Sequence, residues 1–333
     1  MLYELPRLKH VNARTVNEAA FLLNKYGHEA RPIAGGTDLL SLMKDKIQTP
    51  QVLVNIKTIP EMTQITYDNA ELSIGAAVTL NNIIASDIIS REFKILTQAA
   101  QQIGTIQIRN RGTVGGNLCQ SSRCIYFRHP EFNCHRKGGP VCYAITGEHR
   151  YYHSIMKYQT CIGTNPSDMA PPLIALKGQA NVTSFKGQRR IPLQQFFTVP
   201  DCSVETENIL KPNEVLTRID VPKPKPGTRQ LFLKSRKRHS SDFSLASVAI
   251  VCQVSKNICR DVNIVLGGIA PTPYVAVEAQ EIITGKELNK ENITRTAEAS
   301  LKGAHPLTSN SYKVNLTKAL IKRALTLISQ EET

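Results

Sequence analysis

TIQIRNRGTVGGNLCQSSRC, residues 105–124, opens the most informative segment of this chain, and YQTCIGTNPSDMAP, residues 158–171, closes it. The segment combines a glycine-rich turn with five of the eight cysteines in the 333-residue sequence. Glycine-rich turns can present backbone N–H groups to a phosphate, and clustered thiols bind soft metals. We therefore expect an anion site beside a metal site, and a redox role for both.

The five cysteines follow the spacing C-x4-C-x9-C-x7-C-x18-C, with arginine, lysine and histidine residues between them. Thiolates are the ligands that iron–sulfur clusters and zinc prefer, and nearby cations keep thiols deprotonated. No C-x2-C pair of the zinc-ribbon kind occurs, and wide spacing around Gly138, Gly139 and Pro140 suits a larger 4Fe–4S cluster. Zinc remains an alternative, as do disulfides or unreactive thiols, although an odd number of cysteines disfavours complete disulfide pairing.

Two glycine turns have the same chemistry. RGTVGGN (111–117) carries Thr113 and Asn117 as side-chain donors, and RPIAGGTDLL (31–40) leads from an apolar run through Gly-Gly-Thr into a helical pattern. Glycines let successive backbone N–H groups point at one anion. A purely structural turn is the alternative for each, but two such turns together suit a pyrophosphate held from both sides.

Flanking patterns outline the rest of the chain. Thr15 and Glu18 form a capping box before a helix that should end near Gly27. A strand followed by a turn is expected over 30–36, and another strand at 51–57. Alternating residues predict paired strands over 65–80, helices follow over 81–103 up to Gly104, and more strands are expected at 180–197 and 213–222. After the linker VPKPKPGT (221–228), two strands and three helices are expected.

Five motifs occur in a fixed order over nearly the whole chain: PIAGGTDLL, QIRNRGTVGGN, SDMAP, LFLKSRKRHSSDFSLASVA and LGGIAPTP. Together they resemble the FAD-binding medium subunit of the xanthine dehydrogenase and carbon monoxide dehydrogenase family of molybdenum hydroxylases. Most members lack the cysteine loop. RCIYFRHPEFNCHRKGGPVCYA resembles the loop that holds an extra 4Fe–4S cluster in bacterial aldehyde oxidoreductases and in 4-hydroxybenzoyl-CoA reductase.

The resemblance implies an α+β fold, with a two-subdomain FAD-binding fold of the vanillyl-alcohol-oxidase/PCMH type and a C-terminal α/β domain. We expect FAD-binding subdomain 1 at 1–57 and subdomain 2 at 58–222, with the iron–sulfur loop inserted at about 119–161. A C-terminal domain of the carbon monoxide dehydrogenase flavoprotein type should follow at 228–331.

The resemblance also assigns site residues. For FAD these are Arg31, Pro32, Ile33, Ala34, Gly35, Gly36, Thr37, Asp38, Ile103, Thr105, Arg109, Thr113, Gly115, Gly116, Asn117, Asp168, Leu216 and Lys234. For the 4Fe–4S cluster they are Cys124, Cys134, Cys142 and Cys161, with Cys119 tied to the FAD turn and held in reserve.

Simpler roles compete for several of these residues. Asp168 could cap a helix, and Lys234 could belong to a solvated basic run with Arg236, Lys237 and Arg238, although the resemblance brings Lys234 to the flavin with Asp242 in support. His135 and His153 are possible substitute ligands but are expected in solvent. Cys202, Cys252 and Cys259 are expected to be small buried hydrophobic residues.

Composition limits the possible functions. The formal net charge is +14, but aromatic residues make up only 6%, tryptophan is absent and the basic residues are dispersed, so nucleic acid is not expected as a partner. No run is long and apolar enough for a membrane span or signal peptide, and we expect a cytoplasmic protein unless a signal-bearing partner exports the complex.

The expected function is electron transfer within a multi-subunit oxidoreductase. By resemblance, a molybdopterin-binding large subunit and a 2Fe–2S small subunit are the partners, and single electrons pass from the partner's 2Fe–2S cluster through FAD to an external acceptor. The 4Fe–4S cluster would relay electrons or stabilise its loop. The alternatives are a standalone FAD-dependent oxidoreductase and, less favoured, a zinc-stabilised nucleic-acid-binding protein.

Overall fold

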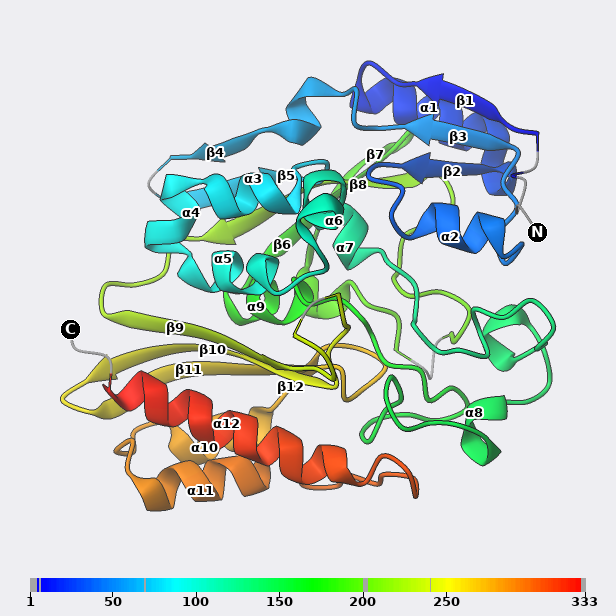
Figure 1. The fold of residues 1–333 in the computed structure, drawn as a ribbon. Helices are drawn as coiled ribbons and strands as arrows, with labels where there is room; N and C mark the ends of the chain where they lie inside the picture. The colour runs from blue at the N-terminus through cyan, green and yellow to red at the C-terminus, as the bar shows by residue number, and fades with distance from the viewer. Residues whose placement is uncertain (1–4, 6, 69, 200–202, 240, 331–333) are drawn as a thin grey trace.

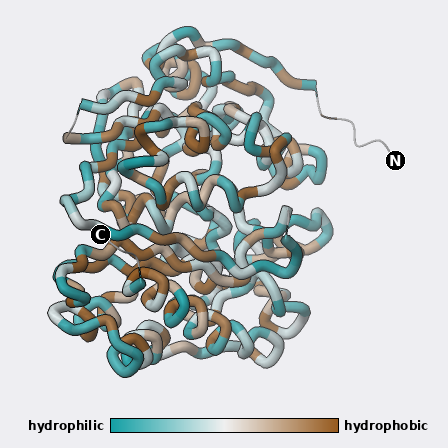
Figure 2. The backbone as a smooth tube through the Cα atoms, turned by 60° about the vertical axis from the view of Figure 1, so that its left-hand side comes forward, coloured by the Kyte–Doolittle hydropathy of each residue, from teal (hydrophilic) through white to brown (hydrophobic). Residues whose placement is uncertain are grey.

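Three β-sheets organise the protein, and helices fill the space between and around them (Figure 1). The structure, a computed structural model, describes residues 5, 7–68, 70–199, 203–239 and 241–330. Apolar segments concentrate in the strands and in the helices that cover them, whereas many of the outer loops are hydrophilic (Figure 2). The fold thus mixes helix and sheet, as expected from the sequence.

The N-terminal sheet is parallel and has the strand order β1-β3-β2, with β1 at Lys9–Asn12, β2 at Ala30–Ile33 and β3 at Val52–Asn55. Parallel neighbours need crossover connections, which the helices α1 (Val16–Tyr26) and α2 (Leu39–Lys44) provide. Thr15 caps α1 by accepting a hydrogen bond from the N–H of Glu18, and α1 ends at Gly27. Both expectations for this helix are confirmed.

The second sheet is antiparallel, with the order β4-β5-β8-β6-β7. Its strands are β4 (Ile65–Tyr67), β5 (Glu71–Gly75), β6 (Gln179–Ser184), β7 (Gly187–Pro192) and β8 (Glu214–Pro222). Between β5 and β6 the chain forms α3 (Leu80–Ala85), α4 (Asp87–Glu92), α5 (Lys94–Gln101), α6 (Ile106–Arg111), α7 (Val114–Leu118), α8 (Tyr143–Thr146) and α9 (Ala170–Ala175). The segment with the cysteines therefore lies within one long connection of this sheet.

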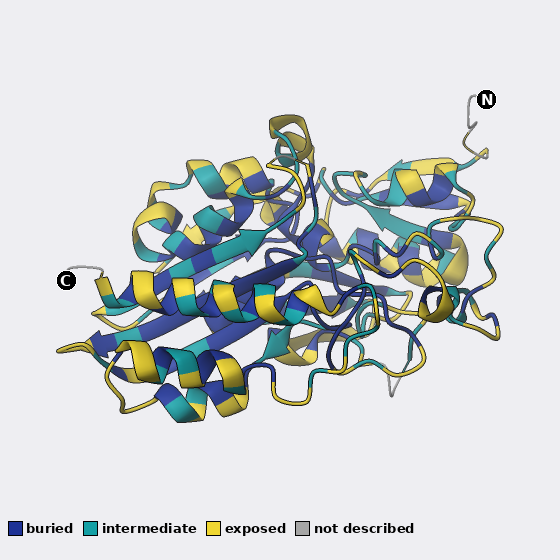
Figure 3. Cartoon of the chain, turned by 60° about the horizontal axis from the view of Figure 1, so that its bottom comes forward, coloured by how far each residue is buried: buried dark blue, intermediate teal, exposed yellow. Residues whose placement is uncertain are grey.

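The third sheet is also antiparallel, with the order β12-β11-β10-β9. It comprises β9 (Thr228–Ser235), β10 (Ala246–Ser255), β11 (Ile258–Gly267) and β12 (Tyr274–Val275). Helices α5 and α9 pack on this sheet, and α10 (Val277–Ile283) and α12 (Tyr312–Gln330) also contact it. Helix α11 (Lys290–Ala299) packs on α10 and α12. The central strands are buried and α12 exposes its outer face (Figure 3).

Single-turn 3-10 helices complete the regular structure at Gly27–Glu29, Pro60–Thr63, His135–Lys137 and Leu193–Gln195. Two local expectations were wrong. Helix α5 ends at Gln101, three residues before Gly104, and most of the glycine turn at 111–117 is helical, since it forms the end of α6 and the start of α7. Among the described residues, no helix is both long and apolar enough to cross a membrane.

Candidate functional site

The two glycine motifs lie against each other. A Cβ atom on Gly35 would lie 2.2 Å from the carbonyl oxygen of Arg111, so only glycine fits there. Gly36 has a φ of +71°, a conformation that favours glycine. Residues 31–36 are all half-buried and Thr37 is exposed, so this turn remains open to a ligand. The predicted pairing of the two motifs is therefore present, although the contacting residues Gly35 and Arg111 lie 76 positions apart in sequence.

The second motif uses its glycines differently from the prediction. Thr113 caps α7 by accepting from the N–H of Gly116 at 3.1 Å, and the N–H of Gly115 donates to the carbonyl of Ala76 at 2.9 Å. A Cβ on Gly115 would lie 2.7 Å from the Cβ of Ala76. Neither Gly115 nor Gly116 has a positive φ. Gly115 thus allows close packing of α7 rather than a sharp bend.

Asn117 connects α7 to the SDMAP motif. Its side-chain oxygen accepts hydrogen bonds from the Ser167 hydroxyl at 2.7 Å and from the N–H of Met169 at 3.2 Å. Ser167 in turn accepts from the N–H of Ala170, so Ser167 caps α9. Asp168 does not serve as this cap, which excludes the simpler of its two predicted roles.

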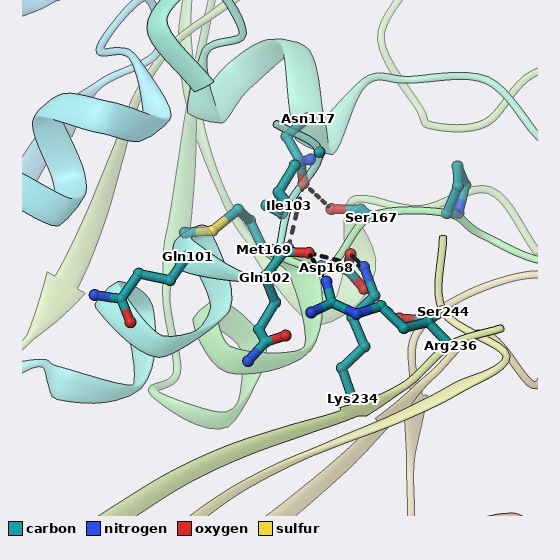
Figure 4. A network of polar contacts seen from close by, with 12 residues as sticks. Gln101, Gln102, Ile103, Asn117, Ser167, Asp168, Met169, Lys234, Arg236 and Ser244 are labelled. Atoms are coloured by element: carbon teal, nitrogen blue, oxygen red, sulfur yellow. Dashed lines mark hydrogen bonds and ion pairs between the residues drawn. The ribbon is translucent and has the colours of Figure 1, made fainter. Parts of the chain in front are cut away.

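Asp168 instead pairs with Lys234 (Figure 4). The Lys234 Nζ lies 2.7 Å from Asp168 Oδ2, and the two side chains are only 1% and 5% exposed. Ser244 donates to the other carboxylate oxygen, and Lys234 also donates to the carbonyl of Gln102 at 3.1 Å. Of the two roles considered for Lys234, a place on a solvated face is excluded, because β9 directs this side chain inward toward the C-terminal end of α5 and the start of α9.

Two neighbouring basic residues, Arg236 and Arg238, are also hydrogen-bonded. Arg236 donates to the same Gln102 carbonyl at 3.1 Å, and Arg238 pairs with Asp242 at 2.8 Å. The hydrogen bond from Arg238 lowers the pKa of Asp242. Lys234 also contributes electrostatically to this lowering, and the predicted support of Lys234 by Asp242 stays a prediction. Arg109 donates to the carbonyl of Ile103 at 3.0 Å.

Several other predicted FAD residues lie in β2, α6 and β8 or at their ends. Arg31, Pro32 and Ile33 lie in β2, Thr105 caps α6 and Leu216 is buried in β8. Arg31 donates to the carbonyl of Ala30 at 2.9 Å, and burial lowers its pKa. Their roles toward FAD stay predictions.

Asp38 joins the first glycine turn to the cysteine segment. Its carboxylate lies 2.6 Å from Arg128 and 2.9 Å from Arg123, and it accepts from the N–H of Ser121 at 2.8 Å. Arg123 also lies over the ring of Phe243, 4.2 Å from its centroid. This link was not predicted, although Arg123 and Arg128 close to Cys124 are a visible signal in the sequence.

The cysteine segment surrounds one cavity. All four predicted cluster ligands line it, together with Phe127, His135, Arg136 and Gly163 among others; the four are Cys124, Cys134, Cys142 and Cys161. Cys119 is not among the lining residues, and burial raises the pKa of its thiol to about 12. Among the described residues, no three His, Cys, Asp or Glu side chains converge on the position of a single ion. The predicted set of four therefore gathers around a shared space.

Burial dominates the electrostatics of these sulfurs. It raises the pKa of Cys124 to about 11, while the nearby N–H groups of Phe127 and Tyr126 act in the opposite direction. Burial likewise raises the pKa of Cys142, opposed by the N–H groups of Ile162 and Ala144. The N–H dipoles therefore offset only part of the cost of burying a thiolate.

Arg136 adds a positive charge beside the cavity. It is buried, forms an ion pair with Glu207 and acts electrostatically on the sulfurs of Cys161 and Cys124. Glu207 also accepts from the N–H of Ser122 at 2.7 Å. The ion pair with Glu207 thereby holds the Arg136 guanidinium close to the sulfurs of Cys161 and Cys124, which would be negatively charged as ligands.

His153 was expected in solvent and is buried instead, with 3% of its surface exposed. Its Nε2 lies 3.3 Å from the Sγ of Cys124, and burial lowers its pKa to about 4. His135 lines the cavity but bonds the carbonyl of Gly139 through Nδ1 at 3.0 Å. Of the remaining cysteines, Cys252 and Cys259 are buried as expected, with their Sγ atoms 3.2 Å apart, whereas Cys202 lies outside the described residues.

Comparison with protein families matches residues 6–224 to the FAD-binding domain in molybdopterin dehydrogenase. Residues 232–328 match the C-terminal domain of the carbon monoxide dehydrogenase flavoprotein. The chain is an FAD-binding medium subunit of the molybdenum hydroxylase family. The predicted family and fold class are confirmed.

Individual relatives of this medium subunit agree with that assignment. The chain is 31% identical to the aldehyde oxidoreductase FAD-binding subunit PaoB of Escherichia coli K12, over 89% of the chain and 90% of PaoB. It is 27% identical to the carbon monoxide dehydrogenase medium chain of Hydrogenophaga pseudoflava, over 96% of each.

A solved carbon monoxide dehydrogenase from Hydrogenophaga pseudoflava superposes with a TM-score of 0.78 at 26% identity, over 97% of both chains. The enzyme from Oligotropha carboxidovorans, at 22% identity and a TM-score of 0.80 over 99% of this chain and 100% of that one, shares the fold. The subunit thus belongs to a family of flavoproteins that serve oxidoreductases of several components.

Proposed function

We propose that this medium subunit carries both FAD and a 4Fe–4S cluster and transfers electrons within a molybdenum-containing aldehyde oxidoreductase. The proposed partners are a molybdopterin-binding large subunit and a 2Fe–2S small subunit. The similarity to an aldehyde oxidoreductase FAD-binding subunit supports this class of complex. A standalone FAD-dependent oxidoreductase is the alternative, and it would purify as active protein without other chains.

The observation that carries the cluster assignment is the common cavity of Cys124, Cys134, Cys142 and Cys161. Four thiolates bind a 4Fe–4S cluster, and the N–H groups near Cys124 and Cys142 would offset part of the cost of burying their charge. The sequence has no C-x2-C pair of the zinc-ribbon kind, and widely spaced cysteines around one cavity suit a larger body than a single ion. Zinc with sulfur ligands is the alternative that metal analysis tests.

For FAD, the proposed contacts are the open turn at residues 31–38, the neighbouring motif at 113–117 with Ile103, Thr105 and Arg109, and Asp168, Leu216 and Lys234. The contact of Gly35 with Arg111 supports a site formed by both turns, because it joins their backbones. FAD exchanges electrons singly or in pairs, and a 4Fe–4S cluster exchanges them singly. The chain's own residues would orient both groups and exclude water from the buried Asp168–Lys234 pair.

The cysteine segment has little apolar core of its own. Its buried cluster contains Leu42, Phe127, Ala144 and Ile162 together with only Cys124 and Cys134. A covalently ligated cluster would compensate for so few buried side chains, in the way that metals stabilise small domains. We therefore propose a structural contribution of the 4Fe–4S cluster, whether or not electrons also pass through it.

Anaerobic purification tests these assignments together. Absorption spectra and chemical analysis should give about one flavin and about four iron and four sulfide per chain. Zinc without flavin would contradict both assignments and favour a zinc-stabilised protein, for which salt-dependent nucleic-acid binding would then be measured. Co-purification with two further chains, one containing molybdopterin, separates the proposed complex from a standalone enzyme.

Two further expectations remain proposals. We propose domains at 1–57, 58–222 and 228–331, which the separate N-terminal, central and C-terminal sheets support and limited proteolysis tests. We propose a cytoplasmic complex unless a partner carries an export signal, and cell fractionation tests its location.

A further inference from the structure

We propose that His153 is a positioning residue that donates a hydrogen bond from Nε2 to the sulfur of Cys124 and thereby raises the reduction potential of the 4Fe–4S cluster. This inference rests on the proposed cluster. It begins from the 3.3 Å separation between the Nε2 of His153 and the Sγ of Cys124 in a buried environment.

The direction of the hydrogen bond follows from the chemistry of the two groups. A cysteine that ligates iron is a thiolate and can only accept, so Nε2 must carry the proton. His153 is buried, and its Nδ1 has no hydrogen-bond partner in the part of the chain that the structure describes. The ring presents Nε2, not Nδ1, to the sulfur. Cluster ligation would thus fix the Nε2–H tautomer.

The position of the ring is set by its backbone. His153 pairs with Gly163 in an isolated β-bridge, and its carbonyl accepts from Lys313 Nζ at 3.0 Å. Lys313 is fully buried on α12 and also donates to the carbonyls of Tyr151, at 3.1 Å, and Gly268. Three carbonyls from two segments therefore fix one ammonium group. The backbone of His153 is therefore held opposite Cys124 by Lys313 on α12 as well as by its bridge to Gly163 in the cysteine segment.

A donor to a ligand sulfur stabilises the reduced cluster more than the oxidised one, because the reduced cluster carries one more negative charge. Removal of the donor should therefore shift the midpoint potential to more negative values. Arg136 supplies charge from elsewhere in the cavity and stays in place in such a variant. The effect of His153 is consequently separable from the overall charge of the site.

The test uses the anaerobically purified holoprotein in four forms: wild type, His153→Leu, His153→Gln and His135→Leu. Potentials are measured by redox titration with EPR detection. His153→Leu should shift the midpoint to more negative values, and His153→Gln, whose amide can still donate, should restore most of the shift. His135→Leu is the matched control, since His135 lines the same cavity but bonds a carbonyl, and it should leave the potential near the wild-type value.

A second measurement does not depend on how well His153→Leu retains its cluster. In protein labelled with 15N-histidine, pulsed EPR of the reduced cluster should detect one coupled 15N nucleus in wild type and in His135→Leu, and none in His153→Gln. Iron-loaded wild type without such a coupling, or unchanged potentials in both His153 variants, would refute the role of His153 while leaving the cluster intact. Wild type without iron and sulfide would refute the cluster itself and the inference with it.

Discussion

Substitution of Asp168 by alanine should destabilise the protein by about 4 kcal/mol. The Asp168–Lys234 ion pair is almost wholly buried, with a 2.7 Å separation and side chains that are 1% and 5% exposed. Removing one member of such a pair leaves an uncompensated charge, which costs about 3–5 kcal/mol. The lost hydrogen bond from Ser244 accounts for about 1 kcal/mol within that range. The carbonyl of Gln102 remains as an acceptor for Lys234 and keeps the cost from being larger.

The double variant Asp168→Ala/Lys234→Met separates charge from packing. It removes both charges, so we expect it to recover most of the loss and to differ from wild type by about 1 kcal/mol. Urea unfolding of the apo chain, followed by far-UV circular dichroism, measures all three proteins. Lys302→Ala is the control, because the Lys302–Glu278 pair spans 3.7 Å with side chains 76% and 57% exposed, and such pairs contribute less than about 1 kcal/mol. A single variant as stable as this control, or a double variant as unstable as the single one, would refute the reasoning.

Three further perturbations test other parts of the molecule. Gly35→Ala places a Cβ against the Arg111 carbonyl and should weaken FAD binding at least about tenfold. Fluorescence titration measures the affinity, and an unchanged value would show that the turns are not packed together. Burial lowers the pKa of Lys313 from 10.5 to about 7, so between these pH values the unfolded chain binds more protons than the folded chain. The free energy of unfolding of the apo-protein should therefore rise with pH across that window. Urea titrations at several pH values should show this rise in wild type and not in Lys313→Met. Cys142→Ser should lose iron and lower the melting temperature more than it changes flavin content, whereas Cys119→Ser, outside the cavity, should keep its iron. Equal iron loss in both would place Cys119 among the ligands.

Local patterns in the sequence predicted most of the secondary structure correctly. The Thr15 cap and the Gly27 end of α1 depend on residues within one or two helical turns, which a sequence shows directly. The grouping of the four later cysteines around one cavity agrees with the ligand set that the family resemblance implied. The second glycine motif was placed correctly but explained wrongly, because Gly115 is required by contact with Ala76, a residue about forty positions earlier.

Polar partners were the least predictable feature. Asp168 was assigned either to a helix cap or to FAD, and its bond with Lys234 joins residues 66 positions apart. Asp38 meets Arg128 across 90 positions, and His153 meets Cys124 across 29. The sequence contains many other charged residues, and charge and spacing alone do not show which of them will be partners in the folded chain.

The sequence by itself determined the family, the helices and strands with local signals, and the thiols available for a cluster, because each depends on short-range patterns or on residue chemistry. Tertiary structure alone decided which charges are buried together, which histidine faces a thiol and why the two glycine motifs need their glycines. These features arise where β9, α9, α12 and the cysteine segment cross, and the free energy of burying a charge depends on the partner that the crossing supplies.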